Sequence, residues 1–396
     1  RQAIKAAAES VLPEHNEGHW NFPDEAWADL LLSREPRTES ASLPATGPPI
    51  DDICSALKDS LSSYIAVQGP PGTGKTRNGS QAVARLAQEG WRIGVVAQSH
   101  AVVDNFLAAV LDFDPTVEIG KEPSGNSGAS HPWHVKKLEK WADVRSGGYV
   151  IGGTAWTFSR ESIHEIGLDL LVIDEAGQFA LANTIACSFA AQRVLLLGDP
   201  QQLPQVSQAA HPEGMERSVL KHVIGDHTTI PPERGYFLDR TYRMHPELTK
   251  AVSHLQYEDR LESAKVAGLR SLEEIPPGVI PVPVDHRGNT TSCPEEAHEV
   301  AAIIESVRGR EWIDARDDER QPPRRIGLSD ILVVAAFNDQ VRLIKRQLEQ
   351  AGLEGVEVGT VDKFQGKEAP VVIVSMATSS AEDLPRVWTS SSHRTG

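Results

Sequence analysis

Short, continuous hydrophobic runs recur along the chain, and each ends in a polar or glycine-rich cluster. The runs are YIAVQ (64–68), IGVVAQS (93–99), LDLLVIDE (168–175), RVLLLGD (193–199), ILVVAAF (331–337) and VVIVSMA (371–377). Hydrophobicity without alternation is typical of strands that are buried on both faces of a parallel sheet. Helical patterns lie between the runs, as in residues 77–88 and 339–350. The alternation of strands and helices predicts an α/β fold with parallel sheets.

The same pattern predicts how the chain divides. A stretch rich in proline and glycine around residues 276–292 separates the runs into two groups. We therefore predict two α/β lobes, over residues 51–235 and 236–396, with an irregular insertion in the first lobe at 112–148. Residues 1–50 hold six prolines and only short helical patterns, and we predict a linker or the tail of an upstream domain there.

Composition restricts the class of protein. The 396 residues include 39 Lys and Arg against 55 Asp and Glu, a formal net charge of −16, and 40% of them are hydrophobic. This is ordinary globular composition, which excludes a disordered or fibrous chain. A protein that binds nucleic acid through a broad basic surface is normally basic overall. Any nucleic-acid site must therefore be a local groove, and charge alone favours an acidic soluble enzyme without such a partner.

No run of about 18 apolar residues is present, so we predict no membrane-spanning segment and no membrane partner. The chain begins with Arg1 and lacks the apolar core of a signal peptide, and it resembles the interior of a longer product. Cys54, Cys187 and Cys293 lie far apart without a Cys-x-x-Cys pair, which indicates neither a disulfide framework nor a zinc ribbon. A reducing cytoplasm fits this usage, and we predict a cytoplasmic location.

One histidine pair has a spacing that a metal ion could use. His131 and His134 lie in the stretch HPWH, which is polar and holds no cluster of further ligands. We therefore predict no metal site at this pair.

A phosphate-binding pattern follows the first hydrophobic run. Residues 69–76 read GPPGTGKT and match G-x-x-x-x-G-K-[ST], directly after a predicted buried strand and directly before a predicted helix. Gly72 and Gly74 allow the backbone to curl so that successive N–H groups point at phosphate oxygens. The helix adds the positive end of its dipole. Lys75 would reach the β- and γ-phosphates, and the Thr76 hydroxyl would ligate Mg²⁺. The alternative is a glycine-rich turn without a ligand, which the full match disfavours.

A pair of carboxylates follows another buried run. Asp174 and Glu175 emerge at the carboxyl end of LDLLVI, and ligands of open α/β sheets bind at that end of the strands. Asp174 is the predicted Mg²⁺ ligand. Glu175 is the predicted general base that takes a proton from the attacking water. Such a pair alone is a weak signal, and the phosphate-binding pattern strengthens it.

Two further residues are candidates for contacts to the γ-phosphate. Gln202, in GDPQQLP after the run RVLLL, could hydrogen-bond this group and so distinguish ATP from ADP. The alternative is a turn in which the prolines only redirect the chain. Arg243, in LDRTYRMHPEL, could act as an arginine finger. Taken alone, an exposed structural arginine would be the better interpretation.

Together these elements resemble the superfamily 1 helicases of the Upf1-like (DNA2/NAM7-type) group, and they span about three quarters of the chain. The motifs occur in the family's order: GPPGTGKT (69–76), AQSH (97–100), GGTAW (152–156), DEAGQ (174–178), GDPQQLP (198–204), TYRMHPEL (241–248) and GTVDKFQGKEAPVVIVSMA (359–377). The resemblance implies a motor of two RecA-like parallel-sheet lobes that hold ATP and Mg²⁺ between them. Single-stranded nucleic acid would run across both lobes, with movement from 5′ to 3′. Contacts in such a channel are to phosphates and stacked bases, and a narrow channel needs only local positive potential.

The resemblance also implies roles for individual residues. The nucleotide site would include Gly69, Pro70, Pro71, Gly72, Thr73, Gly74, Lys75, Thr76, Gln202, Arg243, Gly366 and Glu368. The nucleic-acid contacts would come from Ser99, His100, Thr154 and residues near Thr360. In this arrangement Lys75, Glu175, Gln202 and Arg243 act in hydrolysis, and Arg243 contributes from the second lobe.

More narrowly, the chain resembles a bacterial subgroup in which the helicase half follows a RecB-like nuclease half. The SH pair at 99–100, GGTAW, DEAGQ and AAHPEG (209–214) carry this resemblance. It implies that residues 1–50 are the junction, that the nuclease precedes Arg1, and that DNA is favoured over RNA. No nuclease carboxylate cluster is visible in the sequence, so we predict no nuclease activity for the chain itself.

The sequence departs from the family after the run at 371–377. The family's final motif, Asn-Val-Ala-x-Ser-Arg-Ala, is absent, and residues 385–396 read PRVWTSSSHRTG. If the nucleotide sequence after Arg386 is translated from one base earlier, its codons can encode a stretch similar to the family's Pro-Arg-Gly-x-Glu-Phe-Leu-Tyr-Ser. We therefore hypothesise a frameshift, with a natural divergent end as the alternative, and the nucleotide sequence decides between them. The second lobe would be incomplete, and the chain would bind ATP–Mg²⁺ but hydrolyse ATP poorly, because the missing motif supplies an arginine worth about 10³-fold or more in rate.

Two alternatives to a helicase stay open at this point. A P-loop ATPase that remodels another substrate predicts no stimulation by single strands, and it leaves AQSH, GGTAW and VDKFQG unexplained. A non-catalytic remnant that binds ATP and nucleic acid predicts salt-sensitive binding with negligible turnover. A GTPase and an ABC-type ATPase are disfavoured, because the Asn-Lys-x-Asp and LSGGQ motifs are missing.

Overall fold

The computed structural model of the chain describes residues 2–11, 22–40, 42–45, 47–123, 131–202, 215, 217–316, 319–364 and 366–383. The AAHPEG stretch and the aberrant tail, on which two of the sequence-based hypotheses rest, lie outside these residues.

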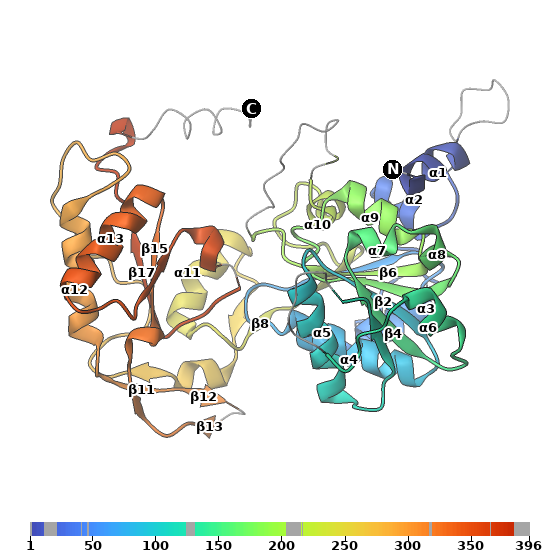
Figure 1. Ribbon diagram of the computed structural model, residues 1–396, viewed down its shortest axis with the longest axis horizontal. Helices are drawn as coiled ribbons and strands as arrows, with labels where there is room; N and C mark the ends of the chain where they lie inside the picture. The colour runs from blue at the N-terminus through green and yellow to red at the C-terminus, as the bar shows by residue number, and fades with distance from the viewer. Residues whose placement is uncertain are drawn as a thin grey trace. The chain divides into compact units, whose positions relative to one another are not determined.

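The chain divides into two compact units, whose elements are labelled in Figure 1. The first unit continues to Met244 and also includes Thr249–Ser263. The second unit consists of His245–Leu248 and the chain from Ala264 onward. The predicted boundary after residue 235 is therefore too early, and the proline- and glycine-rich stretch lies inside the second unit instead of between the two.

A seven-stranded sheet forms the centre of the first unit, with the strand order β3-β4-β2-β5-β6-β1-β7. Every neighbouring pair in it is parallel, as the continuous hydrophobic runs predict. The strands are β1 (Tyr64–Gln68), β2 (Arg92–Val96), β3 (Ile119–Lys121), β4 (Tyr149–Gly153), β5 (Leu168–Ile173), β6 (Ala191–Gly198) and β7 (Gly235–Phe237).

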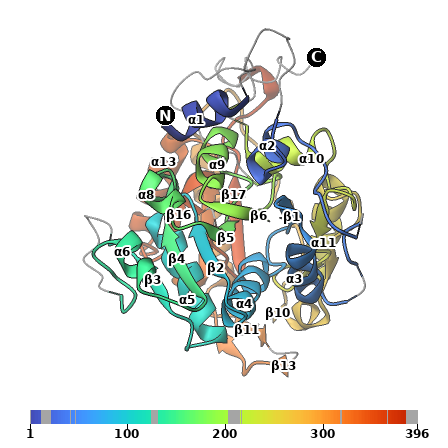
Figure 2. The same ribbon diagram turned by 90° about the vertical axis from the view of Figure 1, so that its right-hand side faces the viewer.

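Both faces of this sheet are buried under helices. Along β1, Tyr64 and Ala66 belong to one hydrophobic cluster and Ile65 and Val67 to another, because successive side chains of a strand point to opposite faces. Figure 2 shows α4 and α5 on one side of the sheet and α8 and α9 on the other. The face of Ile65 is covered by α3 (Pro49–Asp59), α4 (Lys75–Gln88) and α5 (His100–Phe113). The face of Tyr64 is covered by α1 (Gln2–Val11), α2 (Ala26–Leu31), α6 (Leu138–Asp143), α7 (Ala155–Phe158), α8 (Glu161–His164), α9 (Leu181–Ser188) and α10 (Val219–Ile224).

The N-terminal residues differ from the predicted linker. Trp27 is 2% exposed and belongs to the hydrophobic cluster on the Tyr64 face. Asp29 is fully buried, where it pairs with Arg37 at 2.9 Å and accepts a hydrogen bond from the Ser63 hydroxyl at 2.8 Å. A buried carboxylate is tolerated only when it is paired in this way. Residues 22–40 are thus a packed part of the first unit.

The predicted irregular insertion also contains regular structure. Its residues Ile119–Lys121 form β3, which pairs with β4 in parallel, Ile119 opposite Val150. Lys121 is 1% exposed, and its ammonium contacts Asp104 of α5 at 2.9 Å. Trp133 donates from Nε1 to the same carboxylate at 3.1 Å. The insertion therefore extends the sheet by one strand and is held to α5 by a buried ion pair.

The second unit has a smaller parallel sheet, in the order β16-β15-β17. The helices α12 and α13 pack on it around a hydrophobic cluster that includes Ile304, Val333 and Ile344. In β17, Val372 and Val374 are 51% and 62% exposed, so this strand is buried on one face only, in contrast to the predicted burial on both. The elements are β15 (Ile331–Ala335), β16 (Glu357–Gly359), β17 (Val371–Ser375), α12 (Pro294–Val307) and α13 (Asn338–Gln350).

Short elements complete the two units. Three antiparallel strands form one small sheet, two more form a hairpin, and β8 and β9 pair in parallel. These elements are β8 (Arg240–Thr241), β9 (Glu262–Ser263), β10 (Ser271–Leu272), β11 (Glu311–Ile313), β12 (Ala315–Arg316), β13 (Glu319–Arg320), β14 (Arg324–Arg325), α11 (Pro246–Gln256), η1 (Lys265–Leu269), η2 (Leu328–Asp330), η3 (Val361–Phe364) and η4 (Ala381–Asp383). Within the described ranges, every helix is too short or too polar to span a bilayer.

Candidate nucleotide-binding site

The predicted phosphate-binding loop joins β1 to α4 in the first unit. Gly72 and Gly74 have φ angles of 77° and 79°, in the left-handed region that glycine adopts without strain. The Thr73 hydroxyl donates to the carbonyl of Pro70 at 2.8 Å, and the N–H of Asn78 donates to the carbonyl of Gly74 at 2.8 Å. The loop is thus closed by its own hydrogen bonds where α4 begins, and Lys75 and Thr76 form the first turn of that helix.

The Lys75 side chain folds back over this loop. Its ammonium donates to the carbonyl of Gly69 at 2.6 Å. A Cβ atom on Gly69 would lie 2.3 Å from Cγ of Lys75, so only glycine leaves room for this path. The phosphate-binding loop and the Lys75 side chain, both of which the sequence motif specifies, therefore pack against each other.

The chain around Arg243 lies directly against the loop. The N–H of Tyr242 donates to the carbonyl of Gly72 at 2.8 Å, and the Thr241 hydroxyl donates to the carbonyl of Pro71 at 2.9 Å. A Cβ atom on Gly72 would lie 2.3 Å from Cβ of Arg243. Arg243 is thus next to the loop, but it belongs to the first compact unit, so the expectation that it contributes from the second lobe is wrong for this structure.

Asp174 lies at the carboxyl end of β5 and is 3% exposed. Its backbone N–H donates to the carbonyl of Val96, and one carboxylate oxygen accepts from the N–H of Glu175 at 3.0 Å. Burial raises the pKa of Asp174 to about 7, and the negative charge of Glu175 adds to this effect. The Glu175 N–H and the positive charge of Lys75 act in the opposite direction. A cation at this carboxylate would favour its ionised form.

Glu175 begins a tight turn with a φ angle of 55°, a left-handed conformation that is uncommon outside glycine. Its carbonyl accepts from the N–H of Gln178 at 2.8 Å. A Cβ atom on Gly177 would lie 2.1 Å from the carbonyl oxygen of Asp199, so the turn after β5 packs backbone to backbone against the turn after β6. The Glu175 side chain is half-buried.

The turn after β6 contributes a second buried carboxylate, which the sequence reasoning missed. Asp199 is 1% exposed, and the Tyr257 hydroxyl donates to it at 2.7 Å. Burial raises the pKa of Asp199, and the Tyr257 hydrogen bond and the Lys75 charge oppose the shift. Gln202 lies in the same turn, with its N–H donating to the carbonyl of Asp199 at 3.3 Å. An acid directly after a buried run identified Asp174, and the same signal applied to RVLLLGD would have found Asp199.

These groups meet at one edge of the sheet because β5, β6 and β1 are neighbouring parallel strands. The N–H of Gly69 donates to the carbonyl of Gly198 at 2.9 Å, which joins the start of the phosphate loop to the end of β6. The structure therefore brings together Lys75, Asp174 and the turns of Glu175 and Gln202, as the sequence predicts.

The residues predicted to contact nucleic acid in the first unit follow two other neighbouring strands. Val96 of β2 pairs with Gly153 of β4, so the turns after these strands are adjacent. Ser99 is exposed and precedes α5, where its hydroxyl accepts from the N–H of Val102 at 3.3 Å. His100 and Thr154 are half-buried. Trp156, two residues beyond Thr154, is 85% exposed, and the sequence reasoning gave it no role.

Three predicted residues lie in the second unit. Thr360 follows β16, and its carbonyl accepts from the N–H of Lys363 at 3.1 Å. Gly366, with a φ angle of 77°, and Glu368 are exposed between η3 and β17. Whether these three approach the nucleotide or the nucleic acid stays a prediction.

The two histidines of the HPWH stretch contact a neighbouring ring and each other. The ring of His131 stacks on Trp133 with centroids 4.6 Å apart. The backbone N–H of His131 donates to Nδ1 of His134 at 3.3 Å. Among the described residues, the candidate group of three metal-binding side chains is found elsewhere, at His286, Cys293 and Glu296.

Over most of its length the chain is similar in sequence to proteins that are named as helicases. "DNA replication ATP-dependent helicase/nuclease DNA2" of Xenopus laevis is 24% identical over 364 residues, which cover 82% of this chain and 34% of that protein. "DNA replication ATP-dependent helicase/nuclease JHS1" of Arabidopsis thaliana is 27% identical over 364 residues, which cover 83% of this chain and 25% of that protein. The chain thus spans about a third or less of these relatives.

Among solved structures, the arterivirus nonstructural protein 10 helicase in complex with DNA matches with a TM-score of 0.45 and 16% identity, over 82% of this chain and 56% of that one. A family model described as an AAA domain matches residues 215–393, and another with the same description matches residues 52–264. Because the second match covers more than half of the 396 residues, the chain belongs to the AAA-domain family.

Proposed function

We propose that this chain is the ATP-driven motor of a helicase that acts on single-stranded DNA. The observation that carries the proposal is the convergence of the Lys75 ammonium with the Asp174 and Asp199 carboxylates at the ends of β1, β5 and β6. Nucleotides bind at this edge of open α/β sheets. The names of the relatives, which are helicase/nucleases of DNA replication, support the choice of DNA.

The nucleotide would lie on the loop from Gly69 to Gly74, with its phosphates at the start of α4. The backbone N–H groups and the helix dipole attract negative charge there. Mg²⁺ would be held by the Thr76 hydroxyl and the Asp174 carboxylate, and it would neutralise charge on the β- and γ-phosphates. Asp174 fits this role, because a buried carboxylate with a pKa near 7 is stabilised in its ionised form by a cation.

Glu175 would accept a proton from the attacking water, and its turn holds the carboxylate beyond the end of β5. Arg243, packed against Gly72, would stabilise charge on the γ-phosphate. Gln202 would hydrogen-bond the γ-phosphate from the turn after β6. Lys75 would balance the phosphate charge from its position over Gly69.

The single strand would cross the turns after β2 and β4. Ser99, His100 and Thr154 would contact its backbone, with Thr360 contributing from the second unit. Trp156 is exposed on this side and offers a ring on which a base can stack. By analogy with the family, we propose movement from 5′ to 3′ and a cytoplasmic location.

The proposal is tested by measuring ATP hydrolysis by the purified chain with and without single-stranded DNA and RNA. We expect Mg²⁺-dependent hydrolysis that DNA stimulates more strongly than RNA. Hydrolysis that neither polymer changes would favour the ATPase that remodels another substrate. Salt-sensitive DNA binding without hydrolysis would favour the non-catalytic alternative. A strand-displacement assay with 5′ and 3′ overhangs then determines direction.

A further inference from the structure

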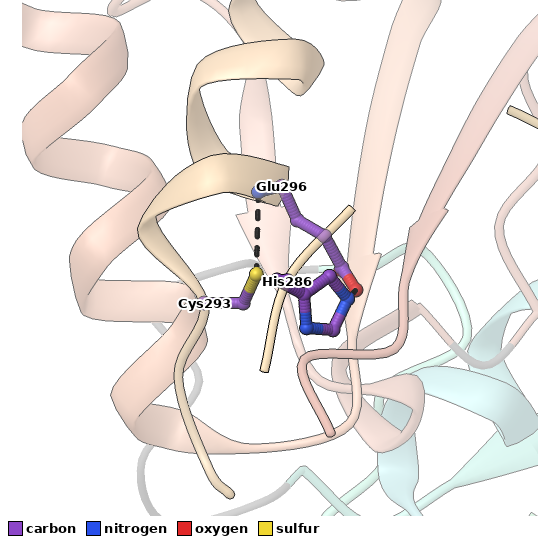
Figure 3. A group of neighbouring side chains, drawn as sticks. All are labelled: His286, Cys293 and Glu296. Atoms are coloured by element: carbon purple, nitrogen blue, oxygen red, sulfur yellow. Dashed lines mark hydrogen bonds and ion pairs between the residues drawn. The ribbon is translucent and has the colours of Figure 1, made fainter. Parts of the chain in front are cut away.

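We propose that His286, Cys293 and Glu296 of the second unit form a binding site for one Zn²⁺ ion. One ligand atom from each side chain lies within 4.8 Å of the other two. Nε2 of His286 is 3.2 Å from Oε1 of Glu296. Figure 3 shows the imidazole, the thiol and the carboxylate gathered at the start of α12. This site shares no residue with the proposed nucleotide site and does not depend on the proposed motor function.

Local sequence places two of the three ligands. Cys293 immediately precedes α12, and Glu296 lies in the first turn of that helix, so both face the same end of it. His286 comes from the extended stretch that leads to the helix. The chain between the histidine and the cysteine contains no helix or strand. The spacing of the two residues is therefore not that of a local metal-binding motif, and no metal site was predicted here.

Each candidate ligand is oriented by a further hydrogen bond. Nδ1 of His286 pairs with the Ser379 hydroxyl at 2.7 Å, which leaves Nε2 facing Glu296. The Ser375 hydroxyl donates to Oε2 of Glu296 at 2.6 Å. The sulfur of Cys293 accepts from the N–H of Glu296 at 3.3 Å. Metal ligands in proteins characteristically have such outer partners, which fix the ring, the carboxylate and the thiolate in place.

The backbone beneath the cysteine is also fixed. The side chain of Gln340, which is fully buried in α13, accepts from the N–H of Cys293 at 2.7 Å and donates to its carbonyl at 3.1 Å. The same amide donates to the Ser375 hydroxyl at 2.9 Å. One buried glutamine therefore connects the cysteine to the serine that orients Glu296, so the site is largely preformed.

The donor set selects the ion. Nitrogen, sulfur and oxygen donors together suit Zn²⁺, whereas Mg²⁺ and Ca²⁺ prefer oxygen alone. Tetrahedral Zn²⁺ with bonds of about 2.0–2.3 Å separates its ligand atoms by roughly 3.5 Å. The histidine–glutamate distance is already close to this value, and the sulfur lies within 4.8 Å of both other ligand atoms.

Binding requires the thiolate, so the proton of the Cys293 thiol must leave. The thiol donates to Oε2 of Glu295 at 3.3 Å, which provides an acceptor that passes the proton to solvent. Water or Glu295 itself would fill the fourth position.

The test uses the full chain, freed of metal and titrated with Co²⁺ as a spectroscopic substitute for Zn²⁺. We expect one equivalent of Co²⁺ to produce the charge-transfer absorption of a Co²⁺–thiolate bond, and Zn²⁺ to abolish it by displacement. Cys293→Ser should remove this absorption. Cys54→Ser and Cys187→Ser are matched controls, because both cysteines are also free and buried, and they should keep it. Lys75→Ala should keep it as well, since Lys75 is not one of the three ligands.

Two further variants help to distinguish a loss of metal binding from a loss of the fold. Glu296→Gln should weaken Zn²⁺ binding. Ser379→Ala removes the hydroxyl that pairs with the imidazole and that also accepts from the N–H of Asn289, and it should weaken binding by about 10-fold to 100-fold. Circular dichroism of each variant without metal checks that the fold is retained. Absence of one-to-one binding by metal analysis after dialysis, or binding that persists in a folded Cys293→Ser variant, would overturn the proposal. The three side chains would then be a hydrogen-bonded network that only holds α12 to the end of β17.

Discussion

The carboxyl edge of the seven-stranded sheet has two parts that are built differently. After β5, β6 and β1, the turns pack backbone against backbone, and the charged side chains Asp174 and Asp199 are buried. After β2 and β4, the turns carry the exposed side chains of Ser99 and Trp156. The first part can bind a small charged ligand in a fixed position, and the second can contact a long polymer along its surface. One sheet edge thus offers two kinds of binding, and substitutions should separate them.

The largest expected effect is at Lys75. Lys75→Ala should lower the rate of ATP hydrolysis by about 10²-fold to 10³-fold, because it removes a charge aimed at the phosphates. DNA affinity should change little, since the lysine lies at the buried part of the edge. Hydrolysis assays and fluorescence anisotropy with labelled single strands measure the two quantities. Lys58→Ala is the control, because Lys58 forms a surface ion pair with Glu89 and should matter little. An equal loss in both assays would contradict the separation.

Gly177 tests the tight packing of the buried part. Gly177→Ala should destabilise the first unit by about 1–3 kcal/mol, because the added methyl group would lie 2.1 Å from the carbonyl oxygen of Asp199. Chemical denaturation measures the change. Gly147→Ala is the matched control, since a Cβ atom at Gly147 meets no atom within 4 Å. Equal stability of the two variants would show that the two turns are not packed this closely.

Trp156 tests the exposed part. Trp156→Ala should weaken binding of single-stranded DNA by about 10-fold. Removal of one stacking ring costs roughly 1–3 kcal/mol of binding free energy. Trp156→Phe should recover most of the affinity, and hydrolysis without DNA should be unchanged. Anisotropy titrations provide the comparison. Val144→Ala removes another exposed apolar side chain and should leave DNA affinity as it is. If Phe and Ala at position 156 behave alike, stacking is not the contact.

The smallest effect concerns Asp199 and pH. Burial raises its pKa in the folded chain, so the folded state holds a proton more tightly than the unfolded state. Stability from this group is therefore present at low pH and decreases as pH rises through the raised pKa. Asp199→Asn, which can still accept from Tyr257, should flatten this part of the pH dependence. Urea denaturation at about pH 5 and about pH 8 measures the slope. A slope identical to that of the unaltered chain would exclude Asp199 as its source.

Sequence could predict those parts of the molecule that contiguous residues specify. The loop at Lys75 and the acid at Asp174 were predictable, because a strand, a turn and a helix follow one another along the chain. The contact of Tyr257 was not predictable, because its hydroxyl donates a hydrogen bond to Asp199, which lies 58 residues away along the chain. The packing of Trp27 was hidden by the prolines around it.

The cluster at Cys293 was missed for a similar reason. His286 is oriented by Ser379, which is 93 residues away, and only the folded second unit brings them together. Thus local patterns predicted the α/β class and the phosphate site. Contacts between distant segments determined the unit boundary, the extra strand β3 and the candidate zinc site.

The backbone of Glu175 has a consequence for how this position can change. A non-glycine residue at a φ angle of 55° costs on the order of 1 kcal/mol, which glycine would not incur. Stability alone would favour glycine here, whereas the proposed role of Glu175 as general base requires its carboxylate. Under that proposal, a substitution to glycine at position 175 would stabilise the fold and slow hydrolysis.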